Sequence, residues 1–197
     1  FRWELTKGEE KLCLTTQNEQ QEYFADAWKR LRISGDDRQR RLAAALHYFH
    51  VARRLDRQGC IAGEFLPEVL LNLSKSLESL FPPSGTGHTR DAAREGLKSL
   101  GYSDSEIEGK FIPAMALRNE LDVAHVELGL FSLGQLKTIQ QFADRAEDAF
   151  SEMFKRVFAK IESGEFEVSS HDLTPPSGKI ISLINRLKEY SASTEQS

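Results

Sequence analysis

The stretch from Ser132 to Ser163 constrains the fold more than any other, because it has the pattern of one long amphipathic helix. Ser132 and Gln135 stand three residues apart, the spacing of a capping box that begins a helix. Apolar residues then recur at intervals of three or four, which places them on one helix face. They are Leu136, Ile139, Phe142, Ala143, Ala146, Phe150, Phe154, Val157, Phe158 and Ile161. Phenylalanine at this spacing is typical of a core or a dimer interface.

Shorter helical patterns precede and follow this stretch. Ser103 and Glu106 form a second capping box, and Pro113 must interrupt or kink the helix that follows. Gly59 and Gly101 end two of the patterns, as glycine commonly does after a last turn. We predict helices over about Gln20–Leu31, Asp37–Gln58, Phe65–Leu80, Arg90–Leu100, Ile112–His125 and Lys179–Tyr190. The predicted fold is therefore all-α, an up-and-down bundle of about five core helices with a C-terminal amphipathic helix.

The first sixteen residues have a different pattern. Apolar and polar residues alternate on both sides of a turn-like segment at residues 7–10, which predicts a short N-terminal β-hairpin. An isolated hairpin is marginal in water, so it either is the remnant of an upstream domain or pairs with the alternating run Phe166–Val168. We predict a hairpin over residues 1–16, a helical domain over 17–165 and an extension over 166–197. Because the chain starts at Phe1, we expect it to be part of a longer protein.

Composition excludes several classes of protein. With 197 residues, 40% of them apolar, the chain has the size and composition of one globular domain. No apolar run approaches the roughly 20 residues of a membrane span, so we expect no membrane partner. The two cysteines, Cys13 and Cys60, predict neither a disulfide framework nor a metal site. We therefore expect a cytoplasmic protein with no metal and no other cofactor.

The segment Arg118-Asn119-Glu120-Leu121-Asp122-Val123-Ala124-His125 carries the chemistry of interest. Arg118 and His125 are seven residues apart, close to two helical turns, so both side chains project from one face. Arginine is well suited to binding phosphate, and histidine exchanges protons near neutral pH. A structural interpretation is also open: Arg118 would pair with Asp122 in the same helix, and His125 would cap its C-terminus.

An arginine, a polar residue and a histidine at this spacing, inside an all-helical chain, resemble the motif of HEPN domains. The leucine-rich helix with Leu70, Leu71, Leu73, Leu77 and Leu80 before the motif helix is also similar to that family. These domains belong to prokaryotic defence and toxin systems. The resemblance implies a metal-independent endoribonuclease in which the RNA 2′-hydroxyl attacks phosphorus. Arg118, Asn119 and His125 would be its catalytic residues, and the alternative is a non-catalytic module for RNA or nucleotide binding and dimerisation.

The resemblance also implies a homodimer, because members of the family bring two motifs into one cleft. One histidine per chain is few for a reaction that needs an acid and a base, and the phenylalanines of the long helix offer apolar surface for an interface. Family toxins controlled by a partner nucleotidyltransferase usually carry a tyrosine two residues after the histidine. That position is Glu127 here, so we expect no such modification.

A basic segment from Lys29 to Arg57 holds nine basic and three acidic residues. Such a run is either a solvated helix face or an electrostatic footprint for RNA. Since Arg118 and His125 independently indicate phosphate, we predict RNA binding by one face of the helix there. Its residues are Arg40, His47, His50, Arg54 and Arg57. His47 and His50 have a spacing compatible with metal binding, but no third ligand is near in the sequence.

The segment from Phe81 to Thr89 is rich in glycine and proline and predicts a loop. Its glycines invite comparison with a phosphate-binding loop. However, the Lys-Ser/Thr ending of a P-loop is missing, and no strand precedes it. We therefore predict a linker between two helices.

Overall fold

The computed structural model describes residues 39–58, 64–120, 131–169 and 175–194, together with single positions at 18, 21, 22, 25 and 32. The predicted hairpin over residues 1–16 and nearly all of the helix predicted over Gln20–Leu31 lie outside this part of the chain. The described residues are helical or irregular, with no strand, so the all-α prediction is confirmed. The helices are α2 (Arg40–Gln58), α3 (Leu66–Leu80), α4 (Thr89–Ser99), α5 (Asp104–Lys110), α6 (Ile112–Glu120), α7 (Leu133–Glu162) and α8 (Gly178–Thr194).

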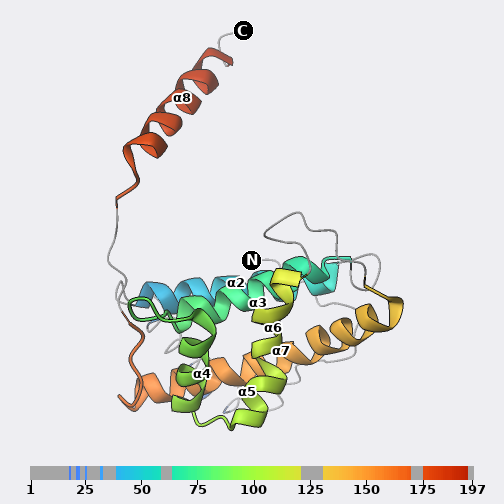
Figure 1. Cartoon of the computed structure of the whole chain (residues 1–197). Helices are drawn as coiled ribbons and strands as arrows, with labels where there is room; N and C mark the ends of the chain where they lie inside the picture. The colour runs from blue at the N-terminus through green and yellow to red at the C-terminus, as the bar shows by residue number, and fades with distance from the viewer. Residues whose placement is uncertain are drawn as a thin grey trace.

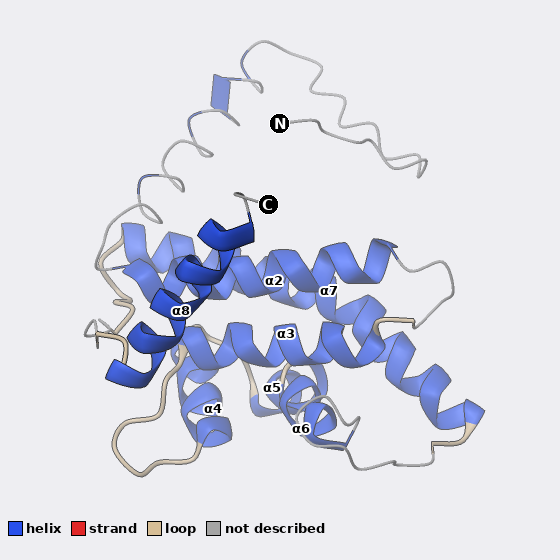
Figure 2. Cartoon of the chain, turned by 90° about the horizontal axis from the view of Figure 1, so that it is seen from above, coloured by secondary structure: helices blue, strands red, loops and turns tan. Residues whose placement is uncertain are grey.

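Helix α3 is the centre of the arrangement. It packs against α2 along its length, and it also contacts α4, α6 and α7 (Figure 1). Seen from above, α3 lies between α2 and the short helices, and α7 passes underneath (Figure 2). The long helices α2 and α3 lie side by side as a pair. Helices α4 and α6 run across this pair, so the arrangement differs from a simple up-and-down bundle.

Local signals explain where the short helices begin and end. Gly101 has a φ of 87°, and the N–H groups of Gly101 and Tyr102 donate to the carbonyls of Lys98 and Leu97. This is the Schellman geometry that ends α4. The capping box of Ser103 and Glu106 then starts α5 as predicted. Pro113 falls in the first turn of α6, directly after the break at Phe111, where its missing N–H is tolerated. The motif helix is therefore a separate short element.

The core is built around aromatic side chains from α2, α7 and the α5–α6 junction. The ring of Phe150 on α7 stacks with Phe49 of α2 at a centroid distance of 6.0 Å, and it lies 5.4 Å from Phe111. Phe154 lies 5.4 Å from Phe49. Such pairs add specific geometry to apolar burial. Because Phe111 immediately precedes α6, this cluster anchors the start of the motif helix.

The phenylalanines that suggested a dimer interface are used inside the chain. Phe150, Phe154 and Phe158 are 0%, 5% and 8% exposed. Of the two roles open from the sequence, these three side chains therefore serve the core, because α2, α3 and the α5–α6 junction close over this face of α7. Among the described residues, the exposed large apolar side chains lie at the start of α7, at Leu133 and Leu136, and on α8, where every described side chain is exposed. The large apolar residues of α8 are Ile180, Ile181, Leu183, Ile184 and Leu187.

The end of α7 and the residues after it are fixed by packing. The short run Phe166–Val168 is irregular, so the strand pairing considered for it is not present there. Phe166 instead meets the ring of Phe81 edge-on at 6.2 Å, and Val168 is 2% exposed. Among the described residues, no helix is long and apolar enough to cross a membrane.

Candidate functional site

Arg118 lies on the face of α6 that is turned toward α3. One turn earlier, Ala114 and Met115 are buried, 0% and 2% exposed, which fixes the rotation of the helix. The Arg118 guanidinium forms an ion pair with the carboxylate of Glu78 on α3. Glu78 also accepts a hydrogen bond of 3.1 Å from the hydroxyl of Ser74, which is itself buried. Both charged side chains are about a quarter exposed, at 23% and 26%. Arg118 is therefore held in a partly sheltered position.

The other motif residues cannot be placed in the same way. The side chain of Asn119 and the whole of Asp122 and His125 lie outside the described residues. The predicted common face of Arg118 and His125 therefore stays a prediction, as does the alternative pair of Arg118 with Asp122. The structure adds a partner that the sequence did not suggest, Glu78, forty residues earlier in the chain.

Arg118 lines a polar hollow of ≈ 350 Å³ between α6 and the first turns of α4. This hollow, which we call the α4–α6 hollow, contains three guanidinium groups and one imidazole. Its wall includes His88, Arg90, Asp91, Arg94, Met115 and Arg118. His88 is the N-cap residue of α4, and its side chain makes no capping hydrogen bond. The segment that the sequence predicted to be only a linker therefore ends at this hollow.

The arginines of α4 differ in their surroundings. Arg94 donates to Glu108 at 2.6 Å and to Asp91 at 2.9 Å. The bond to Glu108 is the main reason that the pKa of Arg94 is raised, and the same bond lowers the pKa of Glu108. Arg90 is exposed and forms no ion pair with any residue that the structure describes. Arg94 thus ties α4 to α5, while Arg90 is available to solvent.

The predicted RNA-binding residues all lie on α2, and all are exposed: Arg40, His47, His50, Arg54 and Arg57. Their common face is as expected, but its C-terminal end is partly neutralised. The guanidiniums of Arg53 and Arg57 lie 2.5 Å and 2.6 Å from the same carboxylate oxygen of Glu147 on α7. Arg57 therefore joins α2 to α7 in addition to any role toward RNA.

Acidic groups gather at this same junction. Asp56 is exposed, but partial desolvation at this junction raises its pKa above the ordinary value, and the nearby carboxylates of Asp144 and Glu147 raise it further. The side chain of Gln140 lowers it by hydrogen bonding. Within the described ranges, no three residues of the metal-ligating types come together, and this includes His47 and His50. The junction is thus an ion-pair network between helices.

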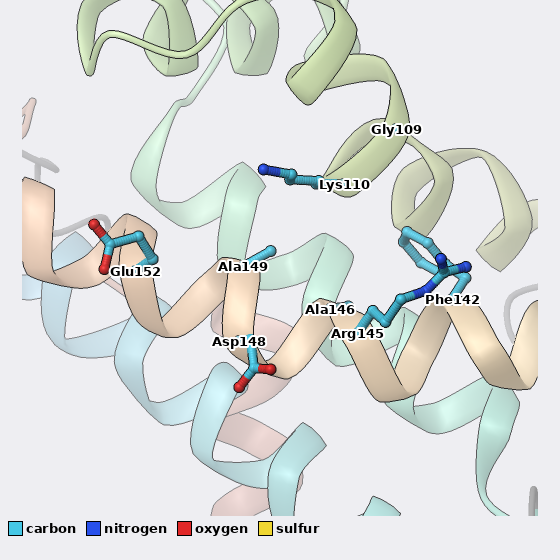
Figure 3. A pocket seen from close by; sticks show the side chains of 8 residues that line it. All are labelled: Gly109, Lys110, Phe142, Arg145, Ala146, Asp148, Ala149 and Glu152. Carbon is cyan, nitrogen blue, oxygen red and sulfur yellow. The ribbon is translucent and has the colours of Figure 1, made fainter.

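A second hollow, of ≈ 400 Å³, lies between the end of α5 and the middle of α7 (Figure 3). Its walls combine the apolar Phe142, Ala146 and Ala149 with charged side chains of both signs, including Lys110, Arg145 and Glu152. In Figure 3 the Lys110 side chain extends along the upper edge, above Ala149. This hollow contains none of the residues predicted to act on RNA, and no imidazole or hydroxyl lines it.

No family model, curated protein or solved structure matches the chain. The candidate function therefore depends on the residues and their geometry.

Sequence reasoning missed His88, Arg90 and Arg94 as companions of Arg118. A signal was present: a histidine directly before a helix, with arginines two and six positions later. What the sequence could not supply was the packing of α4 against α6, which turns that signal into a site.

Proposed function

We propose that this chain is a metal-independent endoribonuclease with a HEPN-like helical domain, acting in a prokaryotic defence or toxin system. The observation that supports the proposal is the position of Arg118, on the wall of a polar hollow that also holds Arg90, Arg94 and His88. Guanidinium groups bind phosphate oxygens with charge-assisted hydrogen bonds. A cluster of them around the motif arginine suits a phosphodiester substrate better than a purely structural helix contact.

In the proposed reaction, the 2′-hydroxyl of one nucleotide attacks the adjacent phosphorus and loses its proton to a base. The 5′-oxygen of the next nucleotide leaves and takes up a proton. The products are a 2′,3′-cyclic phosphate and a 5′-hydroxyl. This step uses no water as a reactant and involves no change of oxidation state. His125 would exchange one of these protons, a role worth about 10²–10⁴ in rate. Arg118 would stabilise the charge on the pentacoordinate phosphorus, and Asn119 would orient a phosphate oxygen or the ring of His125.

The basic face of α2 would bind the RNA strand away from the reacting phosphate, through Arg40, His47, His50, Arg54 and Arg57. A homodimer would bring two copies of His125 to a shared cleft. Mixing Arg118→Ala chains with His125→Ala chains tests this arrangement. Recovered cleavage in the mixture supports a composite site, whereas a monomer with full activity contradicts it.

The alternative is a non-catalytic module that binds RNA or nucleotide. The observation that favours it is the ion pair between Arg118 and Glu78. A carboxylate beside the guanidinium offsets its charge, and phosphate would have to compete with that carboxylate. The two functions predict the same binding but different products.

The test is cleavage of a labelled single-stranded RNA in EDTA, with a 2′,3′-cyclic phosphate as the diagnostic product. We expect cleavage by the unmodified chain and about 10²-fold or greater loss in His125→Ala. Replacement of Arg118 alone would leave Glu78 unpaired, so the matched control is Glu78→Gln, with Arg118→Gln/Glu78→Gln as the test variant. Cleavage that persists in this double variant and in His125→Ala would exclude the enzyme. Binding without cleavage by the unmodified chain would establish the alternative.

A further inference from the structure

The α4–α6 hollow contains more phosphate-binding groups than the motif itself provides. Arg118 enters it from α6, and the residues of α4 and its N-cap enter from the opposite wall. Because Arg90, Arg94 and His88 come from a segment about thirty residues before the motif, they form a second half of the site.

The two arginines of α4, Arg90 and Arg94, differ in the contacts that their side chains make. Three nitrogen atoms of Arg94 are used: Nε and Nη2 bond to Glu108, and Nη1 bonds to Asp91. Arg94 therefore positions α4 and holds the Asp91 carboxylate. Arg90 projects from the first turn of α4, is exposed, and has no ion pair among the described residues. A ligand phosphate would thus meet Arg90 first.

The start of α4 favours the same kind of ligand. Helix N-termini carry N–H groups without intrahelical partners and the positive end of the helix dipole. The His88 side chain makes no capping bond to them. His88 is instead part of the wall of the hollow, beside Arg90. The imidazole and the guanidinium therefore face a shared volume at the N-terminus of an eleven-residue helix, where the Asp91 carboxylate of the first turn is paired with Arg94.

The size of the hollow limits what enters it. Its ≈ 350 Å³ is at the small end of the roughly 300–1,000 Å³ of ligand pockets. That is room for about one nucleotide unit, whereas a base-paired stem is much larger than this volume and could not enter the hollow. Single-stranded RNA can splay individual nucleotides into such a recess, and arginine planes can stack on the exposed bases.

We infer that the α4–α6 hollow is a subsite for one unpaired nucleotide of RNA, whose phosphate is bound by Arg90 and His88 on the α4 side. This subsite adjoins Arg118 and rests on the proposed function, because it places the strand next to the reacting phosphodiester. Arg94 is a positioning residue that keeps α4 in register with α5. Selectivity for single-stranded RNA follows from the size of the hollow.

The experiment is equilibrium binding of a cleavage-resistant 2′-O-methyl oligoribonucleotide, single-stranded or paired with its complement, over a range of salt concentrations. The test variants are Arg90→Gln and His88→Gln. The matched control is Arg145→Gln, an exposed arginine at the other hollow. Helicity and melting temperature, measured for each variant, verify folding. Cleavage of ordinary RNA in EDTA is measured in parallel.

The unmodified chain should bind the single strand more tightly than the duplex. Arg90→Gln should weaken single-strand binding about tenfold, as expected for a charge-assisted contact. It should also reduce the slope of log affinity against log salt by about 1. His88→Gln should lose a smaller factor, and Arg145→Gln should bind as the unmodified chain does.

Equal affinities for Arg90→Gln, Arg145→Gln and the unmodified chain would overturn the subsite. If the unmodified chain still cleaved RNA, the proposed function would stand without it. Equal binding of duplex and single strand would overturn the inference that the nucleotide is unpaired. A chain that neither binds nor cleaves RNA would remove the proposed function and the subsite together.

Discussion

Replacing Gly96 with alanine should destabilise the protein, although Gly96 lies inside helix α4. A glycine-to-alanine change in a helix ordinarily stabilises by about 1 kcal/mol. Here the added Cβ would lie 2.0 Å from Cδ1 and 2.5 Å from Cγ of Phe81, far inside ordinary contact distance. The Phe81 ring is 5% exposed and is held at its edge by Phe166, 6.2 Å away. The ring, or all of α4, must therefore move.

The magnitude follows from two opposing contributions. Forcing an extra methyl group into a packed core costs about 1–3 kcal/mol, against the gain of about 1 kcal/mol in helix propensity. Because the contact is with the base of the ring as well as its edge, we expect the upper part of the range and a net loss of about 1–2 kcal/mol. For a chain of this size that lowers the melting temperature by roughly 2–8 °C.

The assay is urea unfolding followed by circular dichroism, with Gly109→Ala in α5 as the control. A Cβ at Gly109 meets nothing within 4 Å, so the control should be unchanged or slightly stabilised. Phe81→Leu in the Gly96→Ala background should recover part of the loss, which a double-mutant cycle measures as coupling. If Gly96→Ala proved as stable as Gly109→Ala, the close packing of α4 on Phe81, which sets the position of Arg90 and Arg94, would be refuted.

Two further predictions concern charge and capping. Because the pKa of Asp56 is raised, its protonated form contributes stability at low pH that is lost as pH rises through the raised pKa. Asp56→Asn should therefore be more stable than the unmodified chain at neutral pH, by less than about 1 kcal/mol at this exposed site. The advantage should vanish near pH 3 in urea unfolding, and its persistence there would contradict the raised pKa of Asp56. Ser103→Ala should destabilise by about 1 kcal/mol through loss of the α5 cap. NMR titration should then show the pKa of Glu106 rising from about 2, while Lys110 and the backbone N–H of residue 103 still hold it below its ordinary value. An unmoved pKa would rule out the Ser103 hydroxyl as a cause.

Features encoded within a few residues could be predicted from the sequence. The capping boxes at Ser103 and Ser132 and the helix end at Gly101 depend on bonds between residues three to five apart, and all three are present. The buried face of α7 was also predicted, because apolar periodicity identifies the residues that must be covered. The periodicity does not say what covers them. The phenylalanine spacing left a core and a dimer interface open, and for Phe150 the covering side chains are Phe49 and Phe111 of the same chain.

Contacts between distant segments were not predictable in this way. Arg57 meets Glu147, ninety positions later, and Arg118 meets Glu78, because helices pack in three dimensions in an order that local patterns do not fix. The basic face of α2 was predicted as a row of residues, and its neutralisation at one end depends on α7. For the same reason, the sequence did not reveal the α4 half of the candidate site. His88 and Arg90 become relevant only when α4 lies beside α6.

The pair of Arg118 with Glu78 can serve either proposed function, and the difference lies in what a phosphate would do to it. A guanidinium held by one carboxylate in a partly sheltered position is already oriented, so less rotamer entropy is lost when it bonds a ligand. The same carboxylate opposes a ground-state phosphate by like-charge repulsion. The pentacoordinate phosphorus of the transition state carries more negative charge, so the guanidinium can bond it more strongly than it bonds the ground-state phosphate. Only interactions that strengthen in the transition state raise the rate. Glu78→Gln should therefore tighten RNA binding whether the chain is an enzyme or a binding module. If Arg118 acts on the reacting phosphorus, the cleavage rate of this variant should stay the same or fall.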